Sequence, residues 1–321
     1  MILNYLKGFI LKRVGIIGVG NVGSTLAYNL ALNNSCNEIL LKDIREDFIK
    51  ALSLDITQAS ISNNSKTVTK AILENDEFKD CNIIIITAGI ARTPSMSRED
   101  LIIKNANILK NILNDIIKYN QNAIYIIVSN PLDAMVYTTL KYSNLKNNQV
   151  LGMAGELDSA RFKYYIKKAL DFKVNNIEAK VIGAHSNFMV PLVSSIRING
   201  KKADDFLNKT QLEEIIENTK NGGANIVELL KTGSAYFAPA TACSKICNAI
   251  LNDTKEKFIC SVKLSNQYYL EDAILGTSII VGKYGIEKII EENISENELI
   301  ALKKSAISIS ESIKSIDLLI K

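Results

Sequence analysis

Short runs of isoleucine, leucine and valine alternate with longer amphipathic stretches along the first half of the chain. The apolar runs predict strands at 13–17, 37–43, 67–73, 82–87, 123–129 and 150–153. The amphipathic stretches predict helices at 24–32, 46–58 and 99–119. Nearly continuous Ile/Val strands between helices are typical of a parallel sheet covered on both faces. The first half therefore predicts a doubly wound α/β domain, with ligands at the carboxyl ends of its strands.

The second half mixes helices and strands without this regular alternation. Strands are predicted at 179–183, 257–264 and 277–281, and helices from 156, at 211–231, at 236–251 and from 296. Asn199–Gly200 marks a hairpin turn. A chain of 321 residues is longer than a single core usually supports. We therefore expect an N-terminal arm at 1–12, a nucleotide-binding domain at 13–153 and a mixed α+β substrate domain at 154–321.

A GxGxxG motif lies between the first strand and the first helix, which is the context of a dinucleotide-binding turn. Gly18 permits the tight turn, Gly20 lets a pyrophosphate approach the backbone, and Gly23 lets helix and strand pack closely. Asp43 ends the next strand, 25 residues after Gly18. It is either an ordinary carboxylate at a strand end or the acid that binds the adenosine ribose. In the second case it repels a 2′-phosphate and favours NAD over NADP.

The chain contains one histidine, His185, which follows the predicted strand at 179–183. An imidazole that transfers protons near neutral pH has to be this one. The alternative is a core or surface histidine that makes a single hydrogen bond. Asp158 and Arg161 are three residues apart and share one helical face. They either pair on the surface or present an acid and a cation to one pocket.

Polar residues also follow two of the predicted parallel strands. Asn130 lies before Pro131 at the end of the strand at 123–129, where its amide either caps the next helix or contacts a ligand. Arg92 and Arg98 lie six residues apart on the loop after the strand at 82–87. Because a guanidinium matches a carboxylate in shape, the loop predicts a lid over an anion. A solvated basic loop is the other interpretation.

Composition excludes several other classes of protein. Apolar residues make up 47% of the chain and charged residues 22%, and the net charge of +4 comes from lysines scattered among acids. This pattern predicts neither a nucleic-acid surface nor, with apolar runs of strand length, a membrane span. The five cysteines form no CxxC pair, and the chain has only one histidine that could complete a metal site, so we expect none. Reduced thiols and the lack of an export signal predict a cytoplasmic protein.

Taken together and in order, the motifs resemble those of the lactate/malate dehydrogenase family along nearly all of residues 13–321. The motifs are GVGNVG at 18–23, Asp43, ARTPSMSR at 91–98, VSNPLDA at 128–134, LDSARF at 157–162, His185 with MVP at 189–191, and LLKTGSAYFAPA at 229–240. The likeness is closer to malate dehydrogenases of the lactate-dehydrogenase-like type. It implies a Rossmann domain followed by a catalytic domain, the NAD-dependent reversible oxidation of (S)-malate to oxaloacetate in the tricarboxylic acid cycle, and a homodimer or homotetramer.

The resemblance also implies a role for each site residue. His185 would give a proton to the carbonyl oxygen of a 2-keto acid, a contribution of about 10²–10⁴ in rate, and Asp158 would stabilise the imidazolium. Arg161 would bind the substrate's 1-carboxylate and Arg98 would polarise its carbonyl. Asn130 would orient the substrate and Ser234 would shape the pocket. The implied cofactor-binding residues are Gly18, Gly20, Asn21, Val22, Gly23, Asp43, Ala88, Gly89, Asn105, Ser129 and Asn130.

Substrate choice is assigned to Arg92, because the family has arginine at this lid position in malate enzymes and glutamine in lactate enzymes. Pyruvate would leave this arginine enclosed and unpaired, at a cost of about 3–5 kcal/mol if fully buried. Oxaloacetate or malate is therefore preferred, with lactate dehydrogenase as the rival.

Three departures from the family's pattern keep a third interpretation open. Ser95 replaces a usual glycine in the lid, and Glu156 replaces an apolar residue before LDSARF. Ser186 and Asn187 replace the glycine and aspartate of the usual His-Gly-Asp. The third interpretation is a family member that binds NAD with impaired catalysis.

Overall fold

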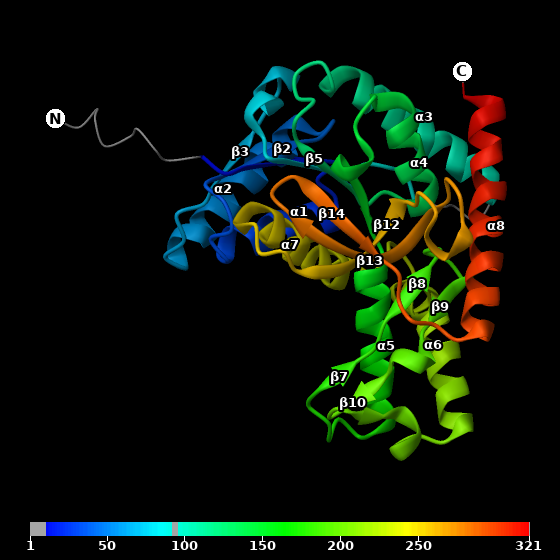
Figure 1. The fold of residues 1–321 in the computed structure, drawn as a ribbon. Helices are drawn as coiled ribbons and strands as arrows, with labels where there is room; N and C mark the ends of the chain where they lie inside the picture. The colour runs from blue at the N-terminus through cyan, green and yellow to red at the C-terminus, as the bar shows by residue number, and fades with distance from the viewer. Residues whose placement is uncertain (1–10, 92–95, 321) are drawn as a thin grey trace.

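One long sheet runs through the molecule in the computed structural model, which describes residues 11–91 and 96–320 (Figure 1). Its first part consists of β1 (Arg13–Ile17), β2 (Glu38–Lys42), β3 (Val68–Ala71), β4 (Ile83–Ile86), β5 (Ile124–Ile127) and β6 (Val150–Met153). These strands are parallel and lie in the order β3-β2-β1-β4-β5-β6. This is the Rossmann order, so the predicted doubly wound sheet is confirmed.

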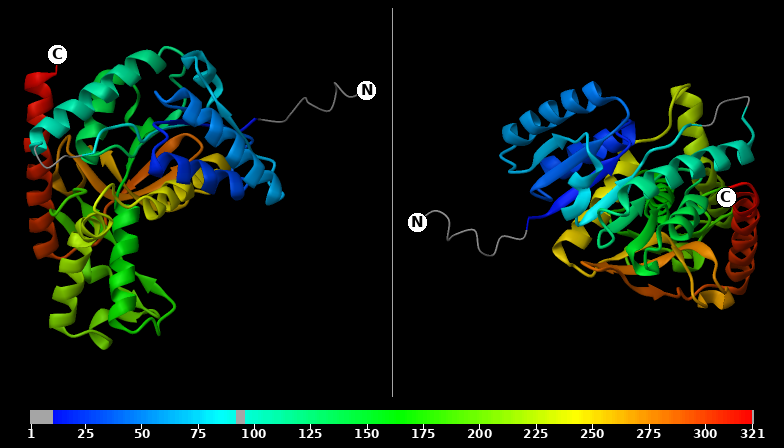
Figure 2. Two further views of the ribbon diagram at one scale, coloured as in Figure 1. Left: turned by 180° about the vertical axis from the view of Figure 1, so that it is seen from behind. Right: turned by 90° about the horizontal axis from the view of Figure 1, so that it is seen from above.

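Helices cover both faces of this parallel part. They are α1 (Asn21–Leu32), α2 (Glu46–Ser62), α3 (Arg98–Ile116) and α4 (Leu132–Ser143). The buried residues of α1 recur at the spacing of a single helical stripe, which explains why this segment packs as a helix against the strands. On one face α1 contacts α2 and α7 (Phe237–Asn252); on the other, α3 and α4 contact each other and α8 (Glu296–Leu319). Figure 2 shows α8 standing at one edge of the molecule.

The sheet continues into the second half of the chain, where its strands become antiparallel. The strands are β12 (Lys257–Lys263), β13 (Ile274–Gly282), β8 (Val181–Gly183), β9 (Met189–Pro191) and β14 (Gly285–Ile290). β12 pairs with β6 and β13, β8 pairs with β13 and β9, and β14 pairs with β13. The carboxyl end of β8 therefore reaches the same sheet as the nucleotide-binding strands, which brings His185 toward them.

A smaller lobe extends from this sheet (Figure 1). It contains α5 (Gly155–Ala169), α6 (Lys209–Leu230), and a separate sheet of β7 (Ile177–Glu178), β10 (Arg197–Ile198) and β11 (Lys201–Lys202). Both Asn199 and Gly200 have positive φ, which is the backbone of the predicted hairpin turn. The lobe has its own apolar core, which includes Phe162, Ile166 and Ile196. The mixed α+β character expected of the second half is confirmed.

Short 3₁₀ turns complete the described chain. They are η1 (Asn75–Asp80), η2 (Asn147–Gln149), η3 (Val193–Ser195), η4 (Ala203–Asp205) and η5 (Gln267–Tyr269). Within residues 11–91 and 96–320, no helix combines the length and apolar character needed to cross a membrane.

The sequence pattern misplaced some strands in the second half. The predicted strand at 179–183 begins only at Val181, where β8 starts and the backbone N–H donates to the Ser159 hydroxyl at 3.0 Å. β9 was missed because three residues are too few to show a period of two. β14 was missed because it is a partly exposed strand with charged residues, rather than a buried apolar run.

Candidate active site

The turn between β1 and α1 requires glycine and leaves open space in front of it. Gly18 has φ +86°, and a Cβ there would lie 2.5 Å from the Ala88 backbone. A Cβ on Gly20 would meet no atom within 4 Å. No side chain caps α1 at Gly20, so the N–H groups of its first turn, starting at Asn21, are available to an anion. This geometry fits the pyrophosphate of a dinucleotide.

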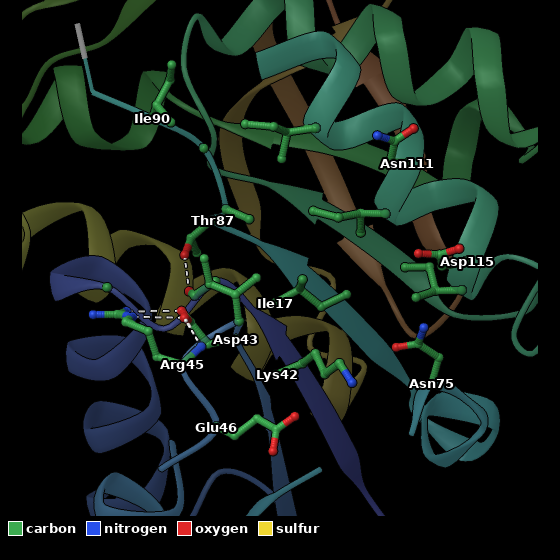
Figure 3. A pocket seen from close by; sticks show the side chains of 18 residues that line it. Ile17, Lys42, Asp43, Arg45, Glu46, Asn75, Thr87, Ile90, Asn111 and Asp115 are labelled. Atoms are coloured by element: carbon green, nitrogen blue, oxygen red, sulfur yellow. Dashed lines mark hydrogen bonds and ion pairs between the residues drawn. The ribbon is translucent and has the colours of Figure 1, made fainter. Parts of the chain in front are cut away.

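A cavity of about 700 Å³ opens beside this turn, at the carboxyl ends of β1, β2 and β4 (Figure 3). Its size is in the range of cofactor pockets. Asp43 and Arg45 lie on one side of it, and Asn111 and Asp115 of α3 lie on the other. The expected cofactor-binding residues that line it are Gly18, Gly20, Asp43, Ala88 and Gly89. Gly23 lies in the first turn of α1, packed against the Gly18 carbonyl.

Arg45 forms an ion pair with the carboxylate of Asp43, a contact that sequence reasoning missed. Oδ1 accepts hydrogen bonds from Nε of Arg45 at 2.9 Å and from its backbone N–H at 3.1 Å. Oδ2 accepts from the Val19 N–H at 2.7 Å and from Nη2 of Arg45 at 3.1 Å. Burial raises the pKa of Asp43, but these hydrogen bonds outweigh it and hold the pKa below its usual value. The guanidinium also lies 4.2 Å from the ring centre of Phe48.

Two expected cofactor residues, Asn105 and Ser129, brace the loops behind the cavities. Oδ1 of Asn105 accepts the Ile90 N–H at 2.8 Å, and its Nδ2 donates to the carbonyls of Ile90 at 3.1 Å and Asn130 at 2.7 Å. The Ser129 hydroxyl donates to the Ala88 carbonyl at 2.6 Å. The loops after β4 and β5 are thereby tied together. Neither side chain lines either of the two cavities described here.

A smaller cavity of about 220 Å³ contains the histidine. It is lined by Val22, Val128, Asn130, Met153, Leu157, Arg161, His185, Gly223, Val227, Ser234, Ala235 and Pro239. It therefore brings together segments that the sequence separates: α1, the end of β5, α5, the end of β8, α6 and the start of α7. Asn130, Arg161, His185 and Ser234 were expected in the substrate site. Val22, expected at the cofactor, also borders this cavity.

Asp158 binds the other two charged residues of the site at once. Its Oδ2 lies 2.7 Å from Nδ1 of His185, and its Oδ1 lies 3.1 Å from Nη1 of Arg161. The carboxylate is 2% exposed. Asp158 and Arg161 thus form a pair, as one interpretation held, but the acid is buried and the half-buried arginine lines the pocket. Burial lowers the pKa of His185, and the charge of Asp158 outweighs it and raises the pKa above its ordinary value.

The main chain at His185 is held from two sides. The N–H of Ala184 donates to the Ser305 hydroxyl of α8 at 2.7 Å. The N–H of His185 donates to Oδ2 of Asp133 in α4 at 2.9 Å, while Oδ1 of Asp133 accepts the Ser261 hydroxyl at 2.6 Å. Sequence reasoning missed Asp133, although it lies within the VSNPLDA motif. The available signal was an acid in the first turn of a helix next to a candidate ligand residue.

The replacements beside His185 fit the backbone. Ser186 is outside the left-handed region, so its position does not require glycine. Its hydroxyl accepts the Phe188 N–H at 3.2 Å. Asn187 is exposed. Glu156 turns toward Lys245 of α7, with 3.9 Å between carboxylate and ammonium, so it does not join the Asp158 pair.

Other expected site residues lie outside the two cavities or outside the described chain. Arg92 and Ser95 are not among residues 11–91 and 96–320. Arg98 is the exposed first residue of α3 and does not line the cavity of His185. Asn130 does not cap α4, because Pro131 is the residue at the cap position and no side-chain cap is present there. Within the described ranges no group of His, Cys, Asp or Glu residues could hold a metal ion.

Models of two protein domains match nearly the whole chain. The model described as lactate/malate dehydrogenase, NAD binding domain, matches residues 12–152. The model described as lactate/malate dehydrogenase, alpha/beta C-terminal domain, matches residues 155–318. The chain belongs to the lactate/malate dehydrogenase family. It is an NAD-dependent 2-hydroxy acid dehydrogenase, and the cofactor expected from the glycine motif is confirmed.

Individual family members agree with this assignment. The malate dehydrogenase of Aliarcobacter butzleri is 54% identical over 94% of this chain and 96% of its own length. The crystal structure of Cryptosporidium parvum malate dehydrogenase superposes with a TM-score of 0.93 at 36% identity, covering 96% of this chain and 100% of that one. The lactate dehydrogenase of the same organism, complexed with lactic acid and NAD, gives a TM-score of 0.91 at 34% identity, with 96% and 98% covered.

Proposed function

We propose that this family member is a malate dehydrogenase that interconverts (S)-malate and oxaloacetate with NAD. The observation that carries the proposal is the buried Asp158 carboxylate, which contacts His185 at 2.7 Å and Arg161 at 3.1 Å on the wall of one cavity. A proton donor and a carboxylate-binding cation are thereby held together. The names and identities of the relatives support malate as the substrate.

His185 moves the proton in this reaction. Its Nδ1–H donates to Asp158, which leaves Nε2 to give a proton to the carbonyl oxygen of the keto acid during reduction. The charge of Asp158 stabilises the imidazolium before transfer and keeps the ring oriented after it. Bound NADH supplies the hydride for the carbonyl carbon. In the direction of malate oxidation, Nε2 takes the hydroxyl proton instead.

Arg161 positions the substrate through its 1-carboxylate. One arm of the guanidinium is held by Asp158, and the fork retains donors for a carboxylate. Gly223 of α6 supports this role, because a Cβ there would lie 3.4 Å from Nη2 of Arg161. Larger side chains at this position would fill the space beside the guanidinium.

The remaining roles rest on the family resemblance. Arg98 polarises the carbonyl, and Arg92 pairs with the second carboxylate of oxaloacetate. Asn130 and Ser234, which line the cavity of His185, orient the substrate and shape the pocket. Because Arg98 begins α3 outside this cavity, its guanidinium has to move to reach the carbonyl.

Steady-state reduction of oxaloacetate and of pyruvate, each with NADH and with NADPH, tests the function. We expect a large preference for oxaloacetate and for NADH. A preference for pyruvate would make the protein a lactate dehydrogenase. Folded protein that binds NADH and reduces neither keto acid would be a family member with impaired catalysis, and the proposed function would be wrong.

We also propose the functional division into 13–153 and 154–321, because the two family models meet between residues 152 and 155. A cytoplasmic homodimer or homotetramer, without nucleic-acid or membrane partners, completes the proposal. All five cysteines are buried free thiols, which suits a reducing compartment. Light scattering on the purified chain measures the oligomeric state.

A further inference from the structure

A second carboxylate lies beside His185 and takes no part in the proton transfer described above. Asp133 is the second residue of α4 and is 7% exposed. Oδ2 accepts the backbone N–H of His185 at 2.9 Å, and Oδ1 accepts the hydroxyl of Ser261 at 2.6 Å. Both oxygens are therefore hydrogen-bonded within the protein, to neutral donors from two other segments.

These two hydrogen bonds do not themselves require an acid. An asparagine in the same place would accept the His185 N–H with its side-chain oxygen and donate its amide N–H to the oxygen of Ser261. A buried carboxylate is harder to desolvate than an amide, and burial raises the pKa of Asp133 for this reason. What the acid adds over the amide is a negative charge next to His185, whose backbone N–H it accepts.

The charges around the imidazole show where this negative charge acts. The charged groups that act on it are Asp158 and Arg161 from α5 and Asp133 from α4. Asp158 and Arg161 pair with each other at 3.1 Å, so the cation offsets part of the acid's effect. Asp133 forms none of the ion pairs found among the described residues. Its effect on the protonation of His185 is therefore not reduced by an ion pair with a cation among the described residues.

We propose that Asp133 is a positioning residue for the dehydrogenase: its carboxylate fixes the main chain at His185, and its charge favours the protonated imidazole. The effect on the histidine rests on the 2.9 Å hydrogen bond that places the carboxylate against the main chain of His185, whereas the consequence for turnover rests on the proposed function. Asp158 and then Asp133 raise the pKa of His185 against the opposing effects of burial and Arg161. Asp133 thereby extends the pH range in which the proton donor is charged.

The single histidine makes a direct test possible. In the untagged chain, the Cε1–H resonance of His185 is the one histidine signal in a proton NMR titration. The test variant is Asp133→Asn, which keeps both hydrogen bonds and removes the charge. The matched control is Ser305→Ala, which removes the buried acceptor of the neighbouring Ala184 N–H and changes no charge.

We expect Asp133→Asn to lower the pKa of His185 by about 1 unit and Ser305→Ala to leave it nearly unchanged. The fall in kcat/KM for oxaloacetate reduction should move to lower pH by the same amount, because the reaction consumes the imidazolium proton. Ser261→Ala is the second variant. Loss of its hydrogen bond favours the protonated acid at Asp133, so this variant should lower the pKa of His185 in the same direction.

An unchanged pKa of His185 in folded Asp133→Asn would overturn the proposal, as would an equal decrease in Ser305→Ala. If Asp133→Asn does not fold, an unchanged pKa in Ser261→Ala has the same meaning. Wild-type protein that reduces no oxaloacetate but shows the NMR shift in Asp133→Asn would disprove the proposed function and support the effect on His185. The two proposals therefore fail separately.

Discussion

Oδ2 of Asp158 lies 2.7 Å from Nδ1 of His185, although 27 residues separate the two along the chain. The acid is 2% exposed and the imidazole 16%. A hydrogen bond to a charged partner is strong when it is shielded from water. The orientation and the protonation of the ring therefore depend on one carboxylate, and this dependence can be measured.

Asp158→Asn should lower kcat for oxaloacetate reduction by about 10²- to 10⁴-fold. The amide retains a hydrogen-bonding group near Nδ1 but supplies no charge to stabilise the imidazolium. NADH affinity, measured by fluorescence titration, should change little, because Asp158 does not line the larger cavity. His185→Ala defines the lowest rate and should likewise retain NADH binding. Loss of NADH binding in His185→Ala would show that the histidine is structural.

The raised pKa of His185 predicts how the rate depends on pH. Reduction needs the protonated ring, so kcat/KM for oxaloacetate should be constant at low pH and fall as the pH rises through the folded-state pKa. That pKa lies above the ordinary value of 6.5. The same shift stabilises the folded chain below the unfolded pKa, and this contribution is lost as the pH rises through the folded pKa. If kcat/KM already decreases at a pH well below 6.5, the role of Asp158 in raising the pKa of His185 is contradicted.

Two glycines of the β1–α1 turn should respond differently to alanine. In Gly18→Ala the new methyl group clashes with the Ala88 backbone, and alanine has to adopt a positive φ. The substitution should therefore lower the free energy of unfolding by at least about 1–2 kcal/mol. Gly20→Ala adds a methyl group to open space and should fold with an almost unchanged Tm. It should nevertheless weaken NADH binding by about tenfold or more, because the methyl group occupies the approach of the pyrophosphate. Unchanged NADH affinity in Gly20→Ala would place the cofactor elsewhere.

Arg45→Ala should sharpen the preference for NADH over NADPH. Without the guanidinium, Asp43 is an unpaired charge that repels a 2′-phosphate more strongly. We expect the ratio of kcat/KM for NADH to that for NADPH to rise by about 5-fold or more, which corresponds to about 1 kcal/mol. Lys50→Ala is the matched control, because Lys50 is a cation of α2 that pairs with Asp47 rather than Asp43. An equal change in the control would point to net charge alone.

Arg92→Gln should reduce the preference for oxaloacetate over pyruvate. The substitution removes the cation expected to pair with the second carboxylate, so kcat/KM for oxaloacetate should fall by about 10- to 1000-fold while that for pyruvate rises. The same assay on both substrates measures the ratio. An unchanged ratio would mean that another residue recognises the second carboxylate.

Local features of the chain were predictable from sequence, and contacts between distant segments were not. The parallel strands and the turn at Gly18 follow from apolar runs and a glycine motif within about 30 residues. The contact between Asp133 and His185 joins positions 52 residues apart, and that between Asp133 and Ser261 joins positions 128 apart. A one-dimensional pattern contains no signal for such pairs. Arg45 was close to Asp43 in sequence, but its direction depends on how α2 leaves the sheet.

The pairing of β6 with β12 has a mechanical consequence. Met153 of β6 is in register with Cys260 of β12. The nucleotide-binding strands and the strand β8 that precedes His185 therefore belong to one hydrogen-bonded sheet. A hinge between the two halves would have to break backbone hydrogen bonds in the middle of the sheet. The spacing between bound cofactor and imidazole is therefore built in when the chain folds. Entry of substrate and exit of product are left to segments that lie outside the sheet.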